Sequence, residues 1–209
     1  MISLNKQAKL SEHFVLGELT KTKHVTADGN IPSHVAIENL KRICENWLED
    51  LRYSYNTLYC LEPGEDYESS KNVEPIIINS GYRSPAVNRL AGGAQNSNHL
   101  TGCAVDIRCA GKEQMIRYAG ILLDIADGTK QDYDELILEQ HGTVCWLHFA
   151  VRPKNNRRRI AFLKAWKTKT AEASKDELGG YSCAVASSLL FSFILCYAEK
   201  YGMHAFGKY

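Results

Sequence analysis

Three side chains of the types that bind zinc lie in two short stretches of the sequence. His99 and Asp106 are seven residues apart, and the small residues Gly102 and Ala104 between them leave room for a tight bend. His148 follows Asp106 by 42 residues, in an apolar run. Two imidazoles and one carboxylate are the protein ligands of an open catalytic zinc site, with water in the fourth position. The sequence therefore predicts that His99, Asp106 and His148 bind one Zn2+ ion.

The last of these ligands lies in a segment with the composition of a buried strand. Residues 144–151 are mostly apolar, and side chains two residues apart along a strand point to the same face. His148 and Trp146 then share a face, so we expect Trp146 to line the site and to contact substrate. The alternative is that each histidine is an ordinary polar residue satisfied within the core.

The residues around the predicted ligands resemble the signature of a known family. That family comprises the zinc D-Ala-D-Ala carboxypeptidases and the related peptidoglycan L,D- and D,D-peptidases, which share the hedgehog-type fold. Its pattern, Ser-x-His-x-x-Gly-x-Ala-x-Asp, is filled here at every fixed position, by Ser97, His99, Gly102, Ala104 and Asp106. The likeness covers about residues 10–155, and its N-terminal part is similar to a branch common in phages and prophages. It implies a zinc peptidase that cleaves peptidoglycan stem peptides.

The resemblance also implies roles for two residues outside the ligand set. Arg83 falls where the family has an arginine that stabilises the oxyanion or binds the substrate carboxylate, and a guanidinium offers a fork of donors to either group. Ser97, two residues before the first ligand, can offer its hydroxyl to a substrate carboxylate. A hydroxyl in that place can equally cap the loop.

A peptidase of this kind also needs a general base. Many members of the family carry an acid three residues before the last histidine ligand, where this chain has Cys145. A thiol is a poor substitute for a carboxylate, so the sequence predicts that Glu139, at the end of the preceding strand, transfers the proton. The alternatives are that Glu139 is an exposed strand-end charge, or that His141 in the following turn takes the role.

Two functions follow from these residues. The first is a zinc metallopeptidase that acts on peptidoglycan in phage or prophage cell-wall lysis. The second is a catalytically weak or inactive module that keeps the fold and the zinc ion for stability or wall recognition, and Cys145 is the feature that favours it.

Composition limits the partners and the compartment. The formal net charge is +1, so no strong field draws the chain to nucleic acid, and the basic cluster at residues 152–159 is expected to be a solvated turn. Seven irregularly spaced cysteines indicate free thiols rather than a disulfide framework. No apolar segment of a secretory signal follows the first residues. The expected location is the cytoplasm until release, and the expected site of action is the bacterial cell wall.

The order of predicted elements indicates an α+β fold. Helical spacing of apolar residues covers 33–53 and 111–127, and the strand-like segments are 75–79, 104–108, 136–139 and 144–151. This order predicts a small antiparallel central sheet flanked by helices, in a zinc peptidase-like domain of residues 1–159. Residues 160–209 are predicted to form a charged linker and an apolar C-terminal helix. Within it, residues 178–198 lack charge over 21 positions, which suits either membrane contact or docking on protein.

Overall fold

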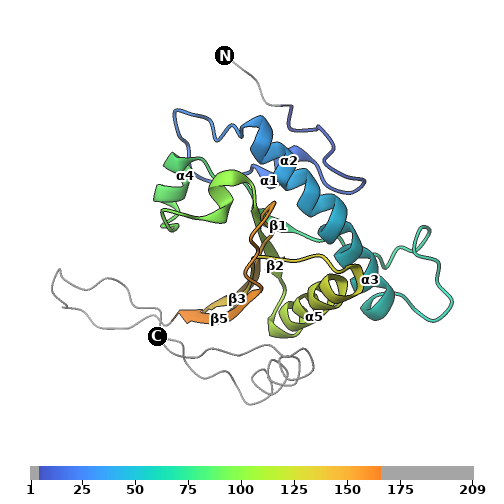
Figure 1. Ribbon diagram of the computed structural model, residues 1–209. Helices are drawn as coiled ribbons and strands as arrows, with labels where there is room; N and C mark the ends of the chain where they lie inside the picture. The colour runs from blue at the N-terminus through green and yellow to red at the C-terminus, as the bar shows by residue number, and fades with distance from the viewer. Residues whose placement is uncertain (1–4, 166–209) are drawn as a thin grey trace.

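The computed structural model describes residues 5–165 of the chain (Figure 1). Its helices and strands follow in this order: α1 (Leu16–Leu19), α2 (His34–Ile43), a π-helical segment η1 (Cys44–Leu48), α3 (Glu49–Tyr59), β1 (Ile78–Ser80), α4 (Pro85–Leu90), a 3-10 helix η2 (Asn98–Thr101), β2 (Ala104–Cys109), α5 (Lys112–Thr129), β3 (Glu135–His141), β4 (Val144–Ala150) and β5 (Arg159–Ala165). The mixture of one sheet with flanking helices confirms the predicted α+β class.

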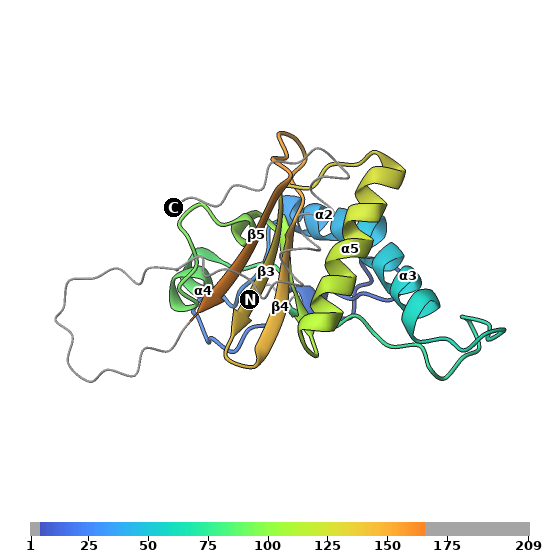
Figure 2. The same cartoon turned by 90° about the horizontal axis from the view of Figure 1, so that it is seen from below.

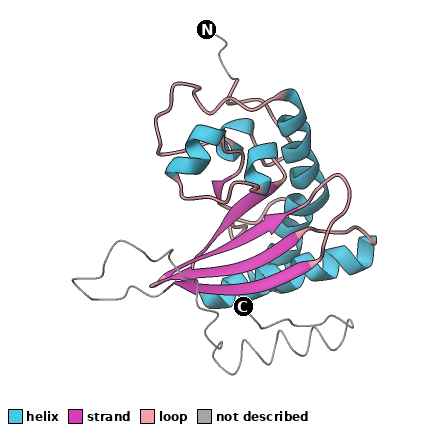
Figure 3. Ribbon diagram, turned by 60° about the vertical axis from the view of Figure 1, so that its left-hand side comes forward, coloured by secondary structure: helices cyan, strands magenta, loops and turns pink. Residues whose placement is uncertain are grey.

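The five strands form one sheet in the order β1-β2-β4-β3-β5 (Figure 3). The pairs β1–β2, β2–β4 and β3–β4 are antiparallel, as predicted, whereas β5 pairs with β3 in parallel. Strand β5 was not predicted, because the basic cluster before it has the composition of a solvated turn after the last core strand. The sheet therefore continues past residue 159, where the domain boundary was expected.

One face of the sheet is apolar and covered by helices. The side chains on this face are buried: Val105, Ile107, Leu136, Leu138, Leu147 and Phe149. They join buried residues of α5 in one core cluster, and Figure 2 shows α5 and α3 on one side of the strands and α4 on the other. The opposite face carries His148 and Asp106, so the sheet separates the hydrophobic core from the predicted metal ligands.

A continuous helical stretch runs from α2 through η1 to α3. The Oγ of Ser33 caps its start by accepting a hydrogen bond from the Ala36 backbone N–H at 3.2 Å. The π-helical turn in the middle places Trp47 fully inside, with its ring 5.0 Å from that of Phe149 on β4. The helix predicted for residues 33–53 is confirmed, and it extends to Tyr59.

Five cysteines in the described part are free, namely Cys44, Cys60, Cys103, Cys109 and Cys145, which confirms the predicted free thiols there. Within residues 5–165, no helix is both long and apolar enough to span a bilayer. The predicted linker and the apolar helix at 178–198 lie outside the described residues.

Candidate metal centre

The first predicted ligand, His99, is held by a 3-10 helix that packs against α2. The Oγ of Ser97 caps this helix by accepting from the His99 backbone N–H at 3.3 Å. Gly102 ends it with φ +70°, a left-handed conformation that favours glycine. A Cβ on Gly102 would come within 2.3 Å of the Ala36 carbonyl oxygen, so the backbone could not approach α2 so closely with a larger residue. The predicted need for a small residue here is thus explained.

The ring of His99 is fixed by a backbone carbonyl. Its Nδ1 lies 2.6 Å from the carbonyl oxygen of Gly81, to which it donates a hydrogen bond when Nδ1 carries the proton. That tautomer leaves the lone pair on Nε2, which faces Asp106 and His148. An acceptor that binds the N–H of the other ring nitrogen commonly orients a metal-binding histidine.

Three predicted ligands converge at one point. The Nε2 of His99 lies 3.2 Å from both Asp106 Oδ1 and His148 Nδ1, and the latter two atoms are 2.9 Å apart. Ligand atoms about 2.0–2.2 Å from a tetrahedral ion are about 3.3 Å from one another. The donor types and spacings therefore fit a zinc-type ion with His99, Asp106 and His148 as its ligands.

Burial and mutual contact perturb the ligands strongly. Although burial opposes its charge, contacts with His99 and His148 hold the pKa of Asp106 far below its ordinary range. Burial likewise opposes the charge of His148, but its contacts with the carboxylates of Asp106 and Glu135 raise its pKa to about 9. Burial lowers the pKa of His99. The three groups form a desolvated cluster around the negative charge of Asp106, and a divalent cation bound there would take the place of the proton on His148.

The strand register places two carboxylates of β3 beside the third ligand. His148 pairs with Ile137, and Glu135 and Glu139 lie two residues to either side of Ile137 on the same face. Glu139 is half-buried, and burial followed by the charge of Asp106 raises its pKa. Glu135 lies with its Oε2 3.6 Å from His148 Nε2. No role was predicted for Glu135, because only the pairing of β3 with β4 places it beside His148.

The other predicted site residues lie on the same side of the sheet. Arg83 contacts the carboxylate of Asp106 and donates from Nε to Ser80 Oγ at 2.8 Å. Trp146, half-buried, pairs across the strands with Glu139. Cys145 points the opposite way and is buried among core residues, since it lies an odd number of residues before His148. An acid at position 145 would face the core rather than the ligands.

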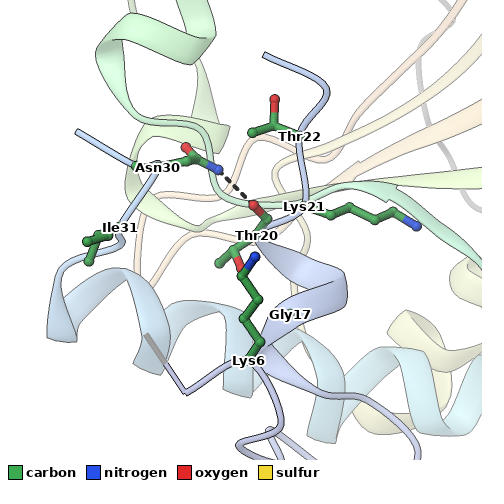
Figure 4. Close-up of a pocket in the computed structure, with 8 residues that line it drawn as sticks. Lys6, Gly17, Thr20, Lys21, Thr22, Asn30 and Ile31 are labelled. Carbon is green, nitrogen blue, oxygen red and sulfur yellow. Dashed lines mark hydrogen bonds between the residues drawn. The ribbon is translucent and has the colours of Figure 1, made fainter. Parts of the chain in front are cut away.

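Buried hydrogen bonds support the turn that carries Arg83. Asn30 donates from Nδ2 to the carbonyl oxygens of Thr20, at 2.9 Å, and Tyr82, at 3.2 Å, and accepts from the Ser84 backbone N–H. Figure 4 shows the first of these bonds in a hollow of about 320 Å3 lined by N-terminal residues and the loop around Asn30. None of the three predicted ligands lines this hollow.

Comparison with known proteins assigns the family. A family model described as Peptidase M15 matches residues 12–122, or 111 of 209 residues, and a search of the curated proteins found no match. The chain belongs to the Peptidase M15 family, the family of zinc D-Ala-D-Ala carboxypeptidase-like enzymes, and that membership indicates a metallopeptidase with a peptidoglycan substrate. The match includes His99 and Asp106 but ends before β3 and β4. His148, Glu135 and Glu139 lie outside the matched residues, and only the strand pairing and the distances bring them to His99 and Asp106.

Proposed function

We propose that this protein is a zinc-dependent hydrolase of peptidoglycan stem peptides, either a D,D-carboxypeptidase or an L,D- or D,D-endopeptidase. We further propose that it acts at the bacterial cell wall in phage or prophage lysis, after release from the cytoplasm. The observation that carries the proposal is the convergence of two imidazoles and one carboxylate within 4.8 Å, with Glu139 on the same face of the sheet. A bound zinc ion would polarise the peptide carbonyl and lower the pKa of a water molecule.

Glu139 is the proton acceptor in this proposal. Its carboxylate takes a proton from the attacking water and delivers it to the amine of the leaving peptide. Burial and the nearby charge of Asp106 raise its pKa, which brings a carboxylate nearer to the range of an effective general base at neutral pH. Position 145 is not needed for this step, since its side chain lies on the other face.

Arg83 and the neighbouring polar groups bind the substrate. The side chain of Arg83 is 18% exposed, and the contacts to Asp106 and Ser80 use only part of its five N–H donors. Its remaining donors stabilise the oxyanion or hold a substrate carboxylate. Trp146 provides an apolar wall beside Glu139, and the hydroxyl of Ser97 adds a hydrogen-bond donor near the first ligand.

Digestion of purified peptidoglycan and of defined muropeptides, with one equivalent of zinc, tests the proposal. Free D-Ala would identify a carboxypeptidase, and new internal amino termini would identify an endopeptidase. Either product should disappear with His148→Ala and Glu139→Gln. Glu38→Gln is the matched control, because Glu38 is an exposed carboxylate on α2, and it should leave the products unchanged. Stoichiometric zinc without any cleavage would contradict the proposal and favour the non-catalytic module.

A further inference from the structure

Glu135 lies on the side of the His148 ring that faces away from the other ligands. The Nδ1 of His148 faces Asp106 at 2.9 Å, whereas its Nε2 lies 3.6 Å from Glu135 Oε2. A hydrogen bond from an N–H needs about 2.7–3.2 Å, so a movement of about half an ångström would close this contact. Glu135 pairs across the strands with Ala150, whose small side chain leaves room for the carboxylate to lean toward the ring.

The two oxygens of Glu135 have different partners. Oε1 accepts from Arg159 Nη1 at 3.0 Å and lies 3.0 Å from Arg157 Nη2. Oε2 accepts from Asn98 Nδ2 at 3.1 Å and is the atom that faces His148. The arginines therefore fix the carboxylate from the β5 side, and the second oxygen remains directed at the imidazole.

Asn98 connects this carboxylate to the loop of the first ligand. It directly precedes His99, and its Nδ2 donates to Asp134 Oδ2 at 2.8 Å as well as to Glu135. Asp134 is fully buried and is itself held by Arg157, at 2.9 Å from Nε and 2.7 Å from Nη2. One network thus links the segments that carry His99 and His148.

We propose that Glu135 is a positioning residue: it accepts a hydrogen bond from His148 Nε2–H and so directs Nδ1 to the metal, while Asn98, Arg157 and Arg159 hold it in place. The inference rests on the proposed function only in taking His148 as a metal ligand. A carboxylate on the outer nitrogen of a ligating histidine fixes its orientation and raises its basicity, and its loss commonly lowers metal affinity 10- to 100-fold. The basic cluster at residues 152–159 then contributes to the metal centre rather than forming only a solvated turn.

Zinc affinity of the full chain, measured by competition with a chromophoric chelator, tests this role. Glu135→Ala should weaken zinc binding 10- to 100-fold. Glu135→Gln should weaken it less, because the amide oxygen still accepts a hydrogen bond. Glu139→Gln is the matched control on the same strand face, and it should bind zinc within about twofold of the wild type.

A second readout separates positioning from a general loss of stability. The d–d absorption bands of the Co2+-substituted protein should shift in Glu135→Ala, return toward the wild type in Glu135→Gln, and stay unchanged in Glu139→Gln. If Glu135→Ala does not fold, Asn98→Ala should still weaken zinc binding, because it frees Glu135 from the ligand loop. Wild-type zinc affinity and wild-type Co2+ spectra in Glu135→Ala, or in Asn98→Ala where Glu135→Ala does not fold, would overturn the inference.

The outcomes also distinguish this inference from the proposed function. Weakened zinc binding in the Glu135 variants without cleavage of peptidoglycan by the wild type would uphold the positioning role and overturn the hydrolase. Cleavage by the wild type with unchanged zinc affinity in the Glu135 variants would uphold the hydrolase and overturn the positioning role of Glu135.

Discussion

Two glutamates of β3 present the same functional group to the same histidine in opposite environments. Glu135 and Glu139 lie symmetrically about the residue that pairs with His148. Glu135 contacts His148 and two arginines. The contact with His148, followed by the charge of Arg157, lowers its pKa to about 2 despite burial. Burial raises the pKa of Glu139 instead. The surroundings, rather than the residue type or the spacing, distinguish the two carboxylates, and on this difference we propose orientation of His148 for Glu135 and proton transfer for Glu139.

The largest expected effects come from removing the charge of Glu139 or of Glu135. Glu139→Gln should lower kcat about 10²- to 10⁴-fold with zinc affinity unchanged, because it removes the general base. Glu135→Gln should lower activity only at limiting zinc, since it weakens binding of the ion. Turnover measured over a zinc titration checks this: excess zinc should restore Glu135→Gln but not Glu139→Gln. Restoration of turnover in both variants, or in neither, would contradict separate roles for Glu135 and Glu139.

The loop that carries Asn98 and His99 sharpens the comparison, because Asn98 donates a hydrogen bond to Glu135. Gly102→Ala should destabilise the protein by about 2–4 kcal/mol, since it combines a left-handed φ with a clash against the Ala36 carbonyl. Gly142→Ala is the matched control: it has φ +63° with nothing within 4 Å of the added Cβ, and should cost about 1–2 kcal/mol. Urea unfolding of the metal-free proteins measures both, and equal losses would contradict the close packing.

The acid stability of the chain should depend on Asp134. Although burial opposes its charge, hydrogen bonds from Arg157 and Asn98 lower its pKa. A lowered folded-state pKa stabilises the protein above the unfolded value of about 3.9, and this contribution is lost as the pH falls below it. Asp134→Asn should therefore cost about 1–3 kcal/mol at pH 7 and show a flatter stability profile between about pH 5 and 2. Parallel profiles for both proteins would contradict this.

The smallest expected effect is the coupling between Asn98 and Glu135. Their hydrogen bond predicts that the losses of zinc-binding free energy in Asn98→Ala and Glu135→Gln are not additive, by about 0.5–1.5 kcal/mol. A double-mutant cycle on zinc affinity measures this term. Additive losses would show that Asn98 acts on His99 alone.

The sequence was sufficient for the features that depend on local patterns. Spacing predicted the helix that Ser33 caps, and the motif around His99 predicted that His99 and Asp106 lie together. Features that depend on pairing between distant segments were not predicted. These are the parallel pairing of β5 with β3, and the position of Glu135 beside His148, which follows from the pairing of β3 with β4. Cys145 is a further example. Only the strand register shows that its side chain faces the core, so an acid at this position would not face the predicted ligands.

The most direct test of the account is X-ray absorption at the zinc edge of the stoichiometrically loaded full chain. We predict one ion per chain with only nitrogen and oxygen neighbours at about 2.0–2.2 Å, including two imidazoles, and loss of one imidazole in His148→Ala. A sulfur neighbour at about 2.3 Å, or failure to load one equivalent of zinc, would show that His99, Asp106 and His148 do not share an ion.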